Sequence, residues 1–135
     1  MINGHATATL IGDPVEAEAL KEVLATPDVE MLKNEVFATG SQQDKSNLKN
    51  TLISAYKGHL GHLNLASGAT EIALCIMAMQ EQKVPGIANL HNPCDDELVF
   101  AKHKEIVPKK IDRFVKVAVG FGANNACLAL ERCQN

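Results

Sequence analysis

Residues 65–82 constrain the fold more than any other part of the chain. This segment is rich in Ala, Ile, Leu and Met and is apolar almost all round. A helix without a polar face is usually buried between layers rather than lying on a surface. Gly68, near its start, would let another backbone approach closely. We therefore expect one long helix held between two layers of structure.

Shorter segments around this helix predict the rest of the architecture. Asp13 as the cap and Pro14 in the first turn predict a helix over residues 14–24, and Glu16 lies three residues after that cap. Segments with strand-like composition follow at residues 51–56, 97–100, 114–119 and 126–131. The order is helix, strand, long helix and three strands. It predicts an α/β fold with a mixed sheet.

Composition narrows the class of protein. The chain has 135 residues, 46% of them hydrophobic, enough for one domain over residues 1–135. A net charge of −3 leaves no basic surface for nucleic acid. No run of ~18 apolar residues predicts a membrane span, and no targeting segment is visible. Residues 31–50 are polar and lysine-rich, which predicts a surface insertion.

The four cysteines predict structural rather than reactive thiols. Cys75, Cys94, Cys127 and Cys133 form no C-x-x-C pair and no metal-ligand spacing. Cys75 lies in the apolar helix, and two aspartates after Cys94 would raise the pKa of its thiol. We expect a soluble protein of a reducing compartment, the cytoplasm or a mitochondrial or plastid matrix.

Two histidine segments are candidates for chemistry. His5, Thr7 and Thr9 alternate with alanines, so in extended backbone their side chains would share one side and face one cavity. The alternative, ordinary strand threonines with a capping or surface histidine, is equally consistent with this spacing. His59 and His62 lie beside glycines, which favours a loop, and His59 reads as an exposed loop residue. No helix or strand is evident ahead of His5, which suggests that an upstream half of the fold is missing.

A metal site is not predicted. His5, His59 and His62 supply three imidazoles, but no H-E-x-x-H or similar ligand spacing is present.

Four blocks of the sequence together resemble a known family. They are residues 3–9 with Gly12, Asp13 and Glu16; Lys57 with Gly61, His62, Ala66–Gly68 and Glu71; residues 85–92; and residues 120–125. In this order they are similar to the C-terminal half of the β-ketoacyl-acyl carrier protein synthases, condensing enzymes of the thiolase superfamily. Thiolases share part of the second block but lack the His-x-Thr-x-Thr segment. The resemblance implies a thiolase-like half of an α/β/α/β/α layered core.

The resemblance also implies a role for each matching residue. His5 and His62 match two histidines that stabilise charge on a thioester oxygen, Lys57 matches the active-site lysine that keeps an imidazole neutral, and Glu71 matches its carboxylate partner. The remaining matches are to groups that bind phosphopantetheine or shape the acyl pocket and oxyanion hole: Thr7 and Thr9 for the former, and Phe121, Gly120 and Gly122 for the latter.

Three departures from the family pattern limit this interpretation. The family's nucleophilic cysteine lies in the N-terminal half, and no cysteine here occupies a matching motif. Ala123 and Asn124 replace a Gly-Thr pair, and Ala118 stands where serine is common. The resemblance therefore implies activity only with a cysteine-bearing N-terminal half or companion subunit, in a dimer or larger assembly. Acyl carrier protein would deliver substrates on its phosphopantetheine, with no other cofactor. The alternative is an inactive structural subunit or a carrier-protein-binding module.

Overall fold

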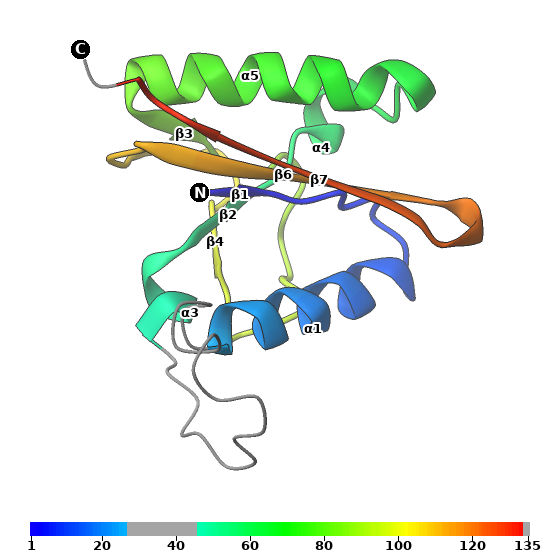
Figure 1. Ribbon diagram of the computed structural model, residues 1–135. Helices are drawn as coiled ribbons and strands as arrows, with labels where there is room; N and C mark the ends of the chain where they lie inside the picture. Colours follow the sequence, from blue (N-terminus) through cyan, green and yellow to red (C-terminus); the bar gives the residue numbers. More distant parts are fainter. Residues whose placement is uncertain (27–45, 134–135) are drawn as a thin grey trace, which may run out of the picture.

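The computed structural model describes residues 1–26 and 46–133 (Figure 1). Its helices are α1 (Gly12–Ala25), α3 (Ser46–Asn50), α4 (Lys57–Leu60) and α5 (Ser67–Glu81), with 3-10 turns at Asn64–Ala66 and Phe121–Ala123. Its strands are β1 (Ile2–Asn3), β2 (Leu52–Ser54), β3 (Lys83–Pro85), β4 (Val99–Phe100), β5 (Ile106–Pro108), β6 (Arg113–Gly120) and β7 (Asn124–Glu131). None of these helices combines the length and apolar character needed to cross a bilayer.

A mixed five-stranded sheet organises the molecule. Its order is β4-β2-β1-β6-β7, in which the first four strands are parallel and β7 runs antiparallel to β6. The helices α1 and α3 lie on one face of this sheet and α5 on the other (Figure 1). The predicted α/β class with a mixed sheet is confirmed. Strand β7 forms one edge of the sheet and is exposed from Asn124 to Ala129.

Two apolar clusters hold the layers together, one on each face of the sheet. Phe114 on β6 is fully buried and packs with the inner face of α5. Burying one such side chain contributes about 1.5–3 kcal/mol relative to leaving it exposed. On the other face Ala17 of α1, Leu48 of α3 and Ile53 of β2 form the second cluster with Leu98. Each face of the sheet therefore has its own core.

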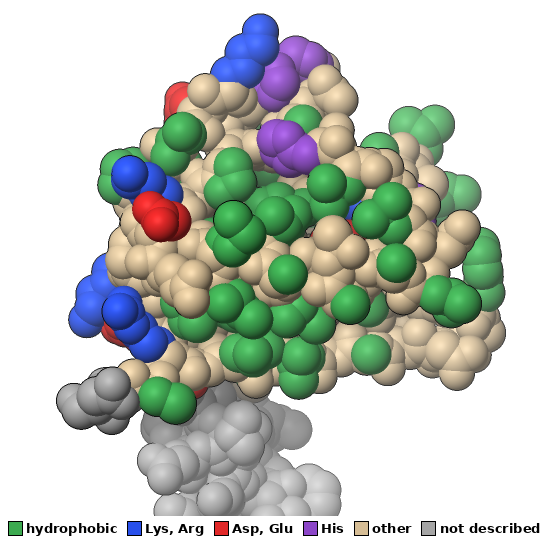
Figure 2. All heavy atoms as spheres, turned by 90° about the horizontal axis from the view of Figure 1, so that it is seen from above, with side chains coloured by type: hydrophobic (Ala, Val, Ile, Leu, Met, Phe, Trp, Pro, Cys, Tyr) green, Lys and Arg blue, Asp and Glu red, His purple; other side chains and the backbone are tan. Residues whose placement is uncertain are grey.

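The long helix is present, but the described residues cover only one of its faces. Its buried residues recur at helical spacing: Ser67, Glu71, Cys75, Ala78 and Met79. On the opposite face Met77 is 57% exposed, and a Cβ added at Gly68 would meet open space. Figure 2 views the molecule from the α5 side and shows hydrophobic side chains scattered across this face. Of the two layers expected around this helix, the described residues supply one, the sheet.

Several local expectations are wrong. A strand does precede His5, because β1 pairs with both β2 and β6 through two residues, too few to leave a visible pattern. Helix α1 begins at Gly12, so that Asp13 lies inside the first turn, and the hydroxyl of Thr9 accepts the Gly12 N–H at 3.1 Å. The expected loop after Lys57 is the short helix α4.

The two-stranded sheet of β3 and β5 was not predicted. Pro85 in β3 and Pro108 in β5 mask the strand character of both segments, since proline normally argues against a strand. Of the polar insertion over residues 31–50, the part up to residue 45 lies outside the described residues. The rest forms α3, whose Leu48 is buried rather than on the surface.

Candidate active site

The two predicted histidines meet at one edge of the sheet. His5 follows β1, and His62 follows β2 through α4. Because β1 and β2 are parallel neighbours, with Asn3 opposite Ser54, their carboxyl ends lie at the same edge. The two imidazole rings lie 5.7 Å apart between centroids and are nearly perpendicular, at 85°. The fold therefore brings together residues that are distant in the sequence.

Local hydrogen bonds orient the ring of His62. Its Nδ1 accepts the backbone N–H of Asn64 at 3.0 Å and lies 3.4 Å from the Ser67 hydroxyl. A ring nitrogen that accepts a backbone N–H carries no proton, so the neutral ring bears its proton on Nε2. His62 is therefore set to donate a hydrogen bond from Nε2.

The backbone at His5 is held by a carboxylate on α1. Glu16 accepts the N–H of His5 at 2.6 Å and that of Ala6 at 2.8 Å. The intervening chain is not the extended segment we expected, because Ala6 and Ala8 have positive φ angles of 41° and 60°. Glu16 was interpreted as part of a helix cap. It instead satisfies two amide donors of a tight turn.

Behind the histidines lies a buried group of three charges. Glu71 on α5 pairs through Oε1 with Lys57 Nζ at 2.6 Å and through Oε2 with Lys116 Nζ at 2.7 Å. All three side chains are at most 6% exposed. The expected pairing of Lys57 with Glu71 is present. Lys116 was missed, although it shares the inward side of β6 with Phe114, two residues before it.

Burial and neighbouring charge favour the neutral form of His5. Burial lowers the pKa of its imidazole, and the ammonium of Lys57 lowers it further. Lys116 and His62 act in the same direction, while Glu16 opposes them. A ring with a lowered pKa is uncharged at neutral pH. Burial likewise lowers the pKa of Lys116, against the opposing effect of Glu71.

These side chains open onto a cavity of about 200 Å³. Its described lining comes from the histidine segments, the start of α5, and strands β6 and β7: His5, Lys57, His62, Asn64, Ser67, Gly68, Lys116, Ala118, Val119, Gly120, Asn124 and Ala126. The space therefore has a cationic and imidazole floor beside a small, mostly apolar wall.

Other residues named by the resemblance lie outside this lining. Thr7 and Thr9 approach one another, with 3.4 Å between their hydroxyls, next to the start of α1. Phe121 is 102% exposed, and Gly122 adopts a φ of 74° in the turn between β6 and β7. Of the predicted pocket and oxyanion residues, Gly120 alone is in the described lining.

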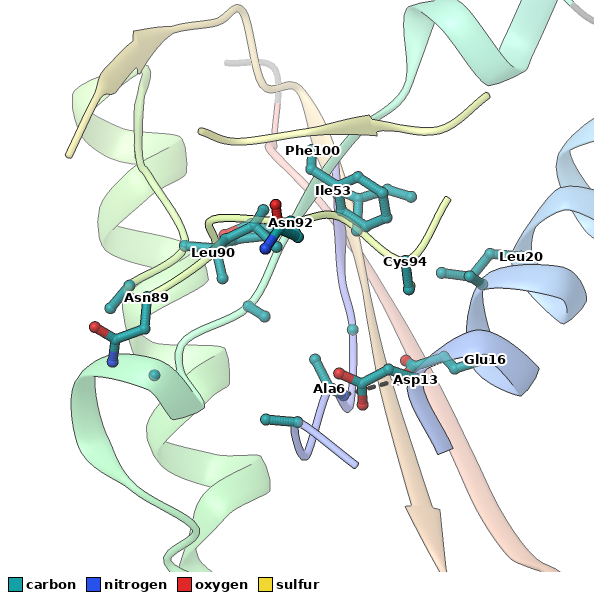
Figure 3. Close-up of a pocket in the computed structure, with 18 residues that line it drawn as sticks. Ala6, Asp13, Glu16, Leu20, Ile53, Asn89, Leu90, Asn92, Cys94 and Phe100 are labelled. Carbon is teal, nitrogen blue, oxygen red and sulfur yellow. Dashed lines mark hydrogen bonds between the residues drawn. The ribbon is translucent and has the colours of Figure 1, made fainter. Parts of the chain in front are cut away.

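A larger cavity of about 240 Å³ lies elsewhere, between α1, β2 and the loop before β4 (Figure 3). Cys94 and Leu20 both line it and lie next to each other in Figure 3. Burial and the nearby Asp13 and Asp95 raise the pKa of the Cys94 thiol. This cavity contains neither imidazole of the first one, and its thiol is not activated.

The other three cysteines also lie outside the described lining of the imidazole cavity. Burial raises the pKa of Cys75 to about 12, while Cys127 and Cys133 are exposed. None of the four cysteines is in the described lining around His5 and His62. Among residues 1–26 and 46–133, no three His, Cys, Asp or Glu side chains are grouped as a metal site requires.

Comparison with known proteins identifies the family. The pattern of the family described as "Beta-ketoacyl synthase, C-terminal domain" matches residues 1–91. The chain is 29% identical to 3-oxoacyl-acyl-carrier-protein synthase 2 of Coxiella burnetii and 30% identical to that of Synechocystis, covering 97% and 98% of this chain. It spans 27% of the length of each of these relatives.

Solved structures show the same fold. The ishigamide ketosynthase/chain length factor superposes with a TM-score of 0.72 at 21% identity, covering 98% of this chain and 28% of that one. A type II polyketide synthase acyl-carrier protein in complex with its ketosynthase, AntDE:AntF, gives 0.76 at 19% identity over the same shares. The thiolase-like fold class is thus confirmed. On the strength of the family pattern, which matches two thirds of its residues, this chain belongs to the β-ketoacyl synthases, whose C-terminal domain it carries.

Proposed function

We propose that this chain supplies the His5, His62 and Lys57 side of a condensation site in a β-ketoacyl-acyl carrier protein synthase. A cysteine-bearing N-terminal half or companion subunit completes the site. The reaction is a decarboxylative Claisen condensation that lengthens a fatty-acid or polyketide chain. The observation that carries the proposal is the edge-to-face pair of imidazoles, 5.7 Å apart, at a cavity backed by buried lysines.

The chemistry places negative charge where these groups can meet it. The partner's cysteine first accepts the acyl chain as a thioester. A malonyl thioester then loses CO₂, and the electron pair of the broken C–C bond becomes an enolate. The enolate carbon attacks the acyl thioester, and the cysteine thiolate leaves. Two preorganised N–H donors aimed at the enolate oxygen stabilise it, an effect worth about 10²–10³ in rate per donor.

Each residue has a defined part in this proposal. His62 donates from Nε2, since its Nδ1 is occupied by the Asn64 N–H. His5 is kept neutral by burial and by Lys57, so that it keeps one ring nitrogen with a proton and one without. Glu71 holds Lys57 in place. These assignments require no resident cofactor or metal.

Substrate delivery follows from the resemblance and from the similar structures. Thr7 and Thr9 are proposed to bind amides of a phosphopantetheine arm on acyl carrier protein, and Phe121 to close the acyl pocket beside the Gly120 and Gly122 amides. A carrier protein in complex with its ketosynthase is the subject of one similar structure. A ketosynthase/chain length factor is the subject of another, which supports pairing with a second subunit.

The apolar side of α5 supports the same need for a second half. Met77 on α5 is 57% exposed, and Leu65, in the 3-10 turn that leads into α5, is 103% exposed. A broad exposed apolar surface marks an interaction site. The cysteine-bearing half is proposed to cover it and to bring its thiol to the His5 and His62 cavity.

A catalytically inactive subunit or carrier-binding module is the second candidate. The position of the four cysteines favours this candidate, because none of them is in the described lining of the cavity that contains His5 and His62.

The test is to purify the chain from its own cells with whatever binds it, and to treat the assembly with a thiol-directed synthase inhibitor. We expect a companion cysteine to be labelled and malonyl-carrier protein to be decarboxylated. Replacing His62 with alanine should slow decarboxylation by about 10²–10³-fold while leaving acyl loading intact.

His59→Ala is the matched control, because the His59 ring lies 2.9 Å from the Gly86 carbonyl and is outside the described cavity lining. A folded assembly with no reactive cysteine, in which His62→Ala and His59→Ala behave alike, supports the inactive subunit instead.

A further inference from the structure

Lys116 is a buried ammonium that takes no direct part in the proposed reaction. It lies on β6 and is 3% exposed. Its ammonium donates hydrogen bonds to the Gly4 carbonyl at 3.1 Å and the Val117 carbonyl at 2.6 Å, and it forms an ion pair with Glu71 Oε2 at 2.7 Å. Such a lysine is fixed in position.

These contacts link Lys116 to the backbone before His5 and to the carboxylate that holds Lys57. Gly4 immediately precedes His5, and its N–H donates to the Ser54 carbonyl of β2 at 2.9 Å. Lys116 therefore holds the carbonyl side of the residue before His5, while β2 holds its amide side. The carboxylate that Lys116 binds is the same one that holds Lys57. One side chain thus touches the supports of two proposed catalytic residues.

The group also has a charge imbalance. Lys57, Lys116 and Glu71 together carry two positive charges and one negative charge at neutral pH, all of them almost out of water. A buried, uncompensated charge acts strongly on its neighbours, because little solvent screens it. The imidazoles of His5 and His62 line the same cavity.

We propose that Lys116 is a positioning residue for His5 and Lys57: it anchors the backbone before His5, takes one oxygen of Glu71, and leaves the three-charge group with one positive charge beside both imidazoles. Its catalytic meaning rests on the proposed condensation, in which that charge keeps the ring of His5 uncharged while both imidazoles donate to the enolate. The positioning itself is a property of this chain alone.

The charged groups around His5 affect how readily its ring is protonated. Lys57 from α4, Lys116 from β6 and the ring of His62 disfavour an imidazolium at His5, as does burial, while Glu16 from α1 favours it. Glu71 from α5 neutralises one of the two lysines. Removing Lys116 takes away a positive charge and frees a carboxylate oxygen. Both changes favour protonation of His5.

The experiment is an NMR titration of the histidine rings in the full chain. Lys116→Met should move the His5 titration midpoint to higher pH and speed hydrogen exchange at the His5 amide by about tenfold, which corresponds to about 1.4 kcal/mol for a lost charged hydrogen bond. Lys116→Gln, which keeps a donor but no charge, should move the midpoint and speed exchange less. Lys110→Met is the control, since Lys110 pairs with Asp112 at the surface, 82% exposed.

A folded Lys116→Met chain with an unchanged His5 midpoint and unchanged exchange overturns the proposal. If that variant does not fold, the wild-type chain decides the question at high pH. The amide signals of Gly4 and His5 should then change with the same midpoint as the Lys116 side chain, and signals that ignore the Lys116 titration refute the anchoring role.

The outcome is separate from that of the condensation test. Coupling seen by NMR in a chain that supports no condensation with a cysteine-bearing half refutes the proposed function and leaves the positioning role intact. Normal condensation by an assembly carrying Lys116→Met, with an unchanged pH profile of kcat, refutes the role of Lys116 only.

Discussion

Replacing Glu71 with glutamine tests the charge group at the centre of the site. Glu71 is 1% exposed and sits between two ammonium groups at 2.6 and 2.7 Å, themselves 6% and 3% exposed. Glutamine keeps the shape but leaves two buried positive charges with no counter-charge. Breaking a buried ion pair in this way costs about 3–5 kcal/mol. For a chain of this length, that lowers Tm by about 12–20 °C.

Lys57→Met is the comparison variant. It removes one ammonium and leaves Lys116 paired with Glu71, so that the group becomes neutral overall. The destabilisation should be clearly smaller, because no buried charge loses its last partner. Chemical denaturation of both variants and the wild type at pH 7 gives the order directly.

The pH dependence of Glu71→Gln supplies a second check. Without the carboxylate, no anionic partner offsets the burial that lowers the pKa of Lys116, so the unfolded chain binds more protons than the folded one. The free energy of unfolding of the variant should therefore rise as the pH increases towards the pKa of lysine in the unfolded chain, about 10.4. A variant as stable as wild type at pH 7, or one whose deficit does not shrink by pH 10, contradicts a charge group of this kind.

Two further predictions concern the backbone around the site. Glu16→Ala leaves two loop amides without their acceptor and should cost about 1–3 kcal/mol by denaturation, while Glu18→Ala, which loses an exposed pair, should cost under about 1 kcal/mol; equal losses would show that the loop needs no carboxylate. Gly58→Ala should destabilise the chain, because its Cβ would collide with the Ala88 carbonyl, and Gly68→Ala should stabilise the isolated chain by about 0.5–1 kcal/mol, since that helical position is open. Thermal melts that reverse this order contradict the packing described.

Long or repetitive features were predictable from the sequence. The apolar composition of helix α5, sustained over four turns, predicted that helix. Strand-like composition on both sides of a glycine loop predicted β6 and β7. The matching motifs predicted that His5 and His62 share one site. The parallel pairing of β1 with β2 is the structural reason that they lie close together.

Short or long-range features were not predictable. Strand β1 has two residues, and its existence depends on neighbours found more than 50 positions later. Lys116 looked like one more charged residue because its partner, Glu71, lies on another element. Only the fact that it shares the buried side of its strand with Phe114 hinted at a lysine inside the protein.

The exposure of β7 sets how the chain behaves in solution. Residues 124–130 contain neither charge nor proline, and in the described structure β7 pairs along one side only, with β6. An open, apolar strand edge is a template for edge-to-edge pairing of identical molecules, which charged or proline-bearing edges resist. Self-association at high concentration is therefore the main hazard of producing this domain by itself. A subunit that packs against the edge of β7 would therefore also prevent aggregation, because it would occupy the edge at which identical molecules could pair.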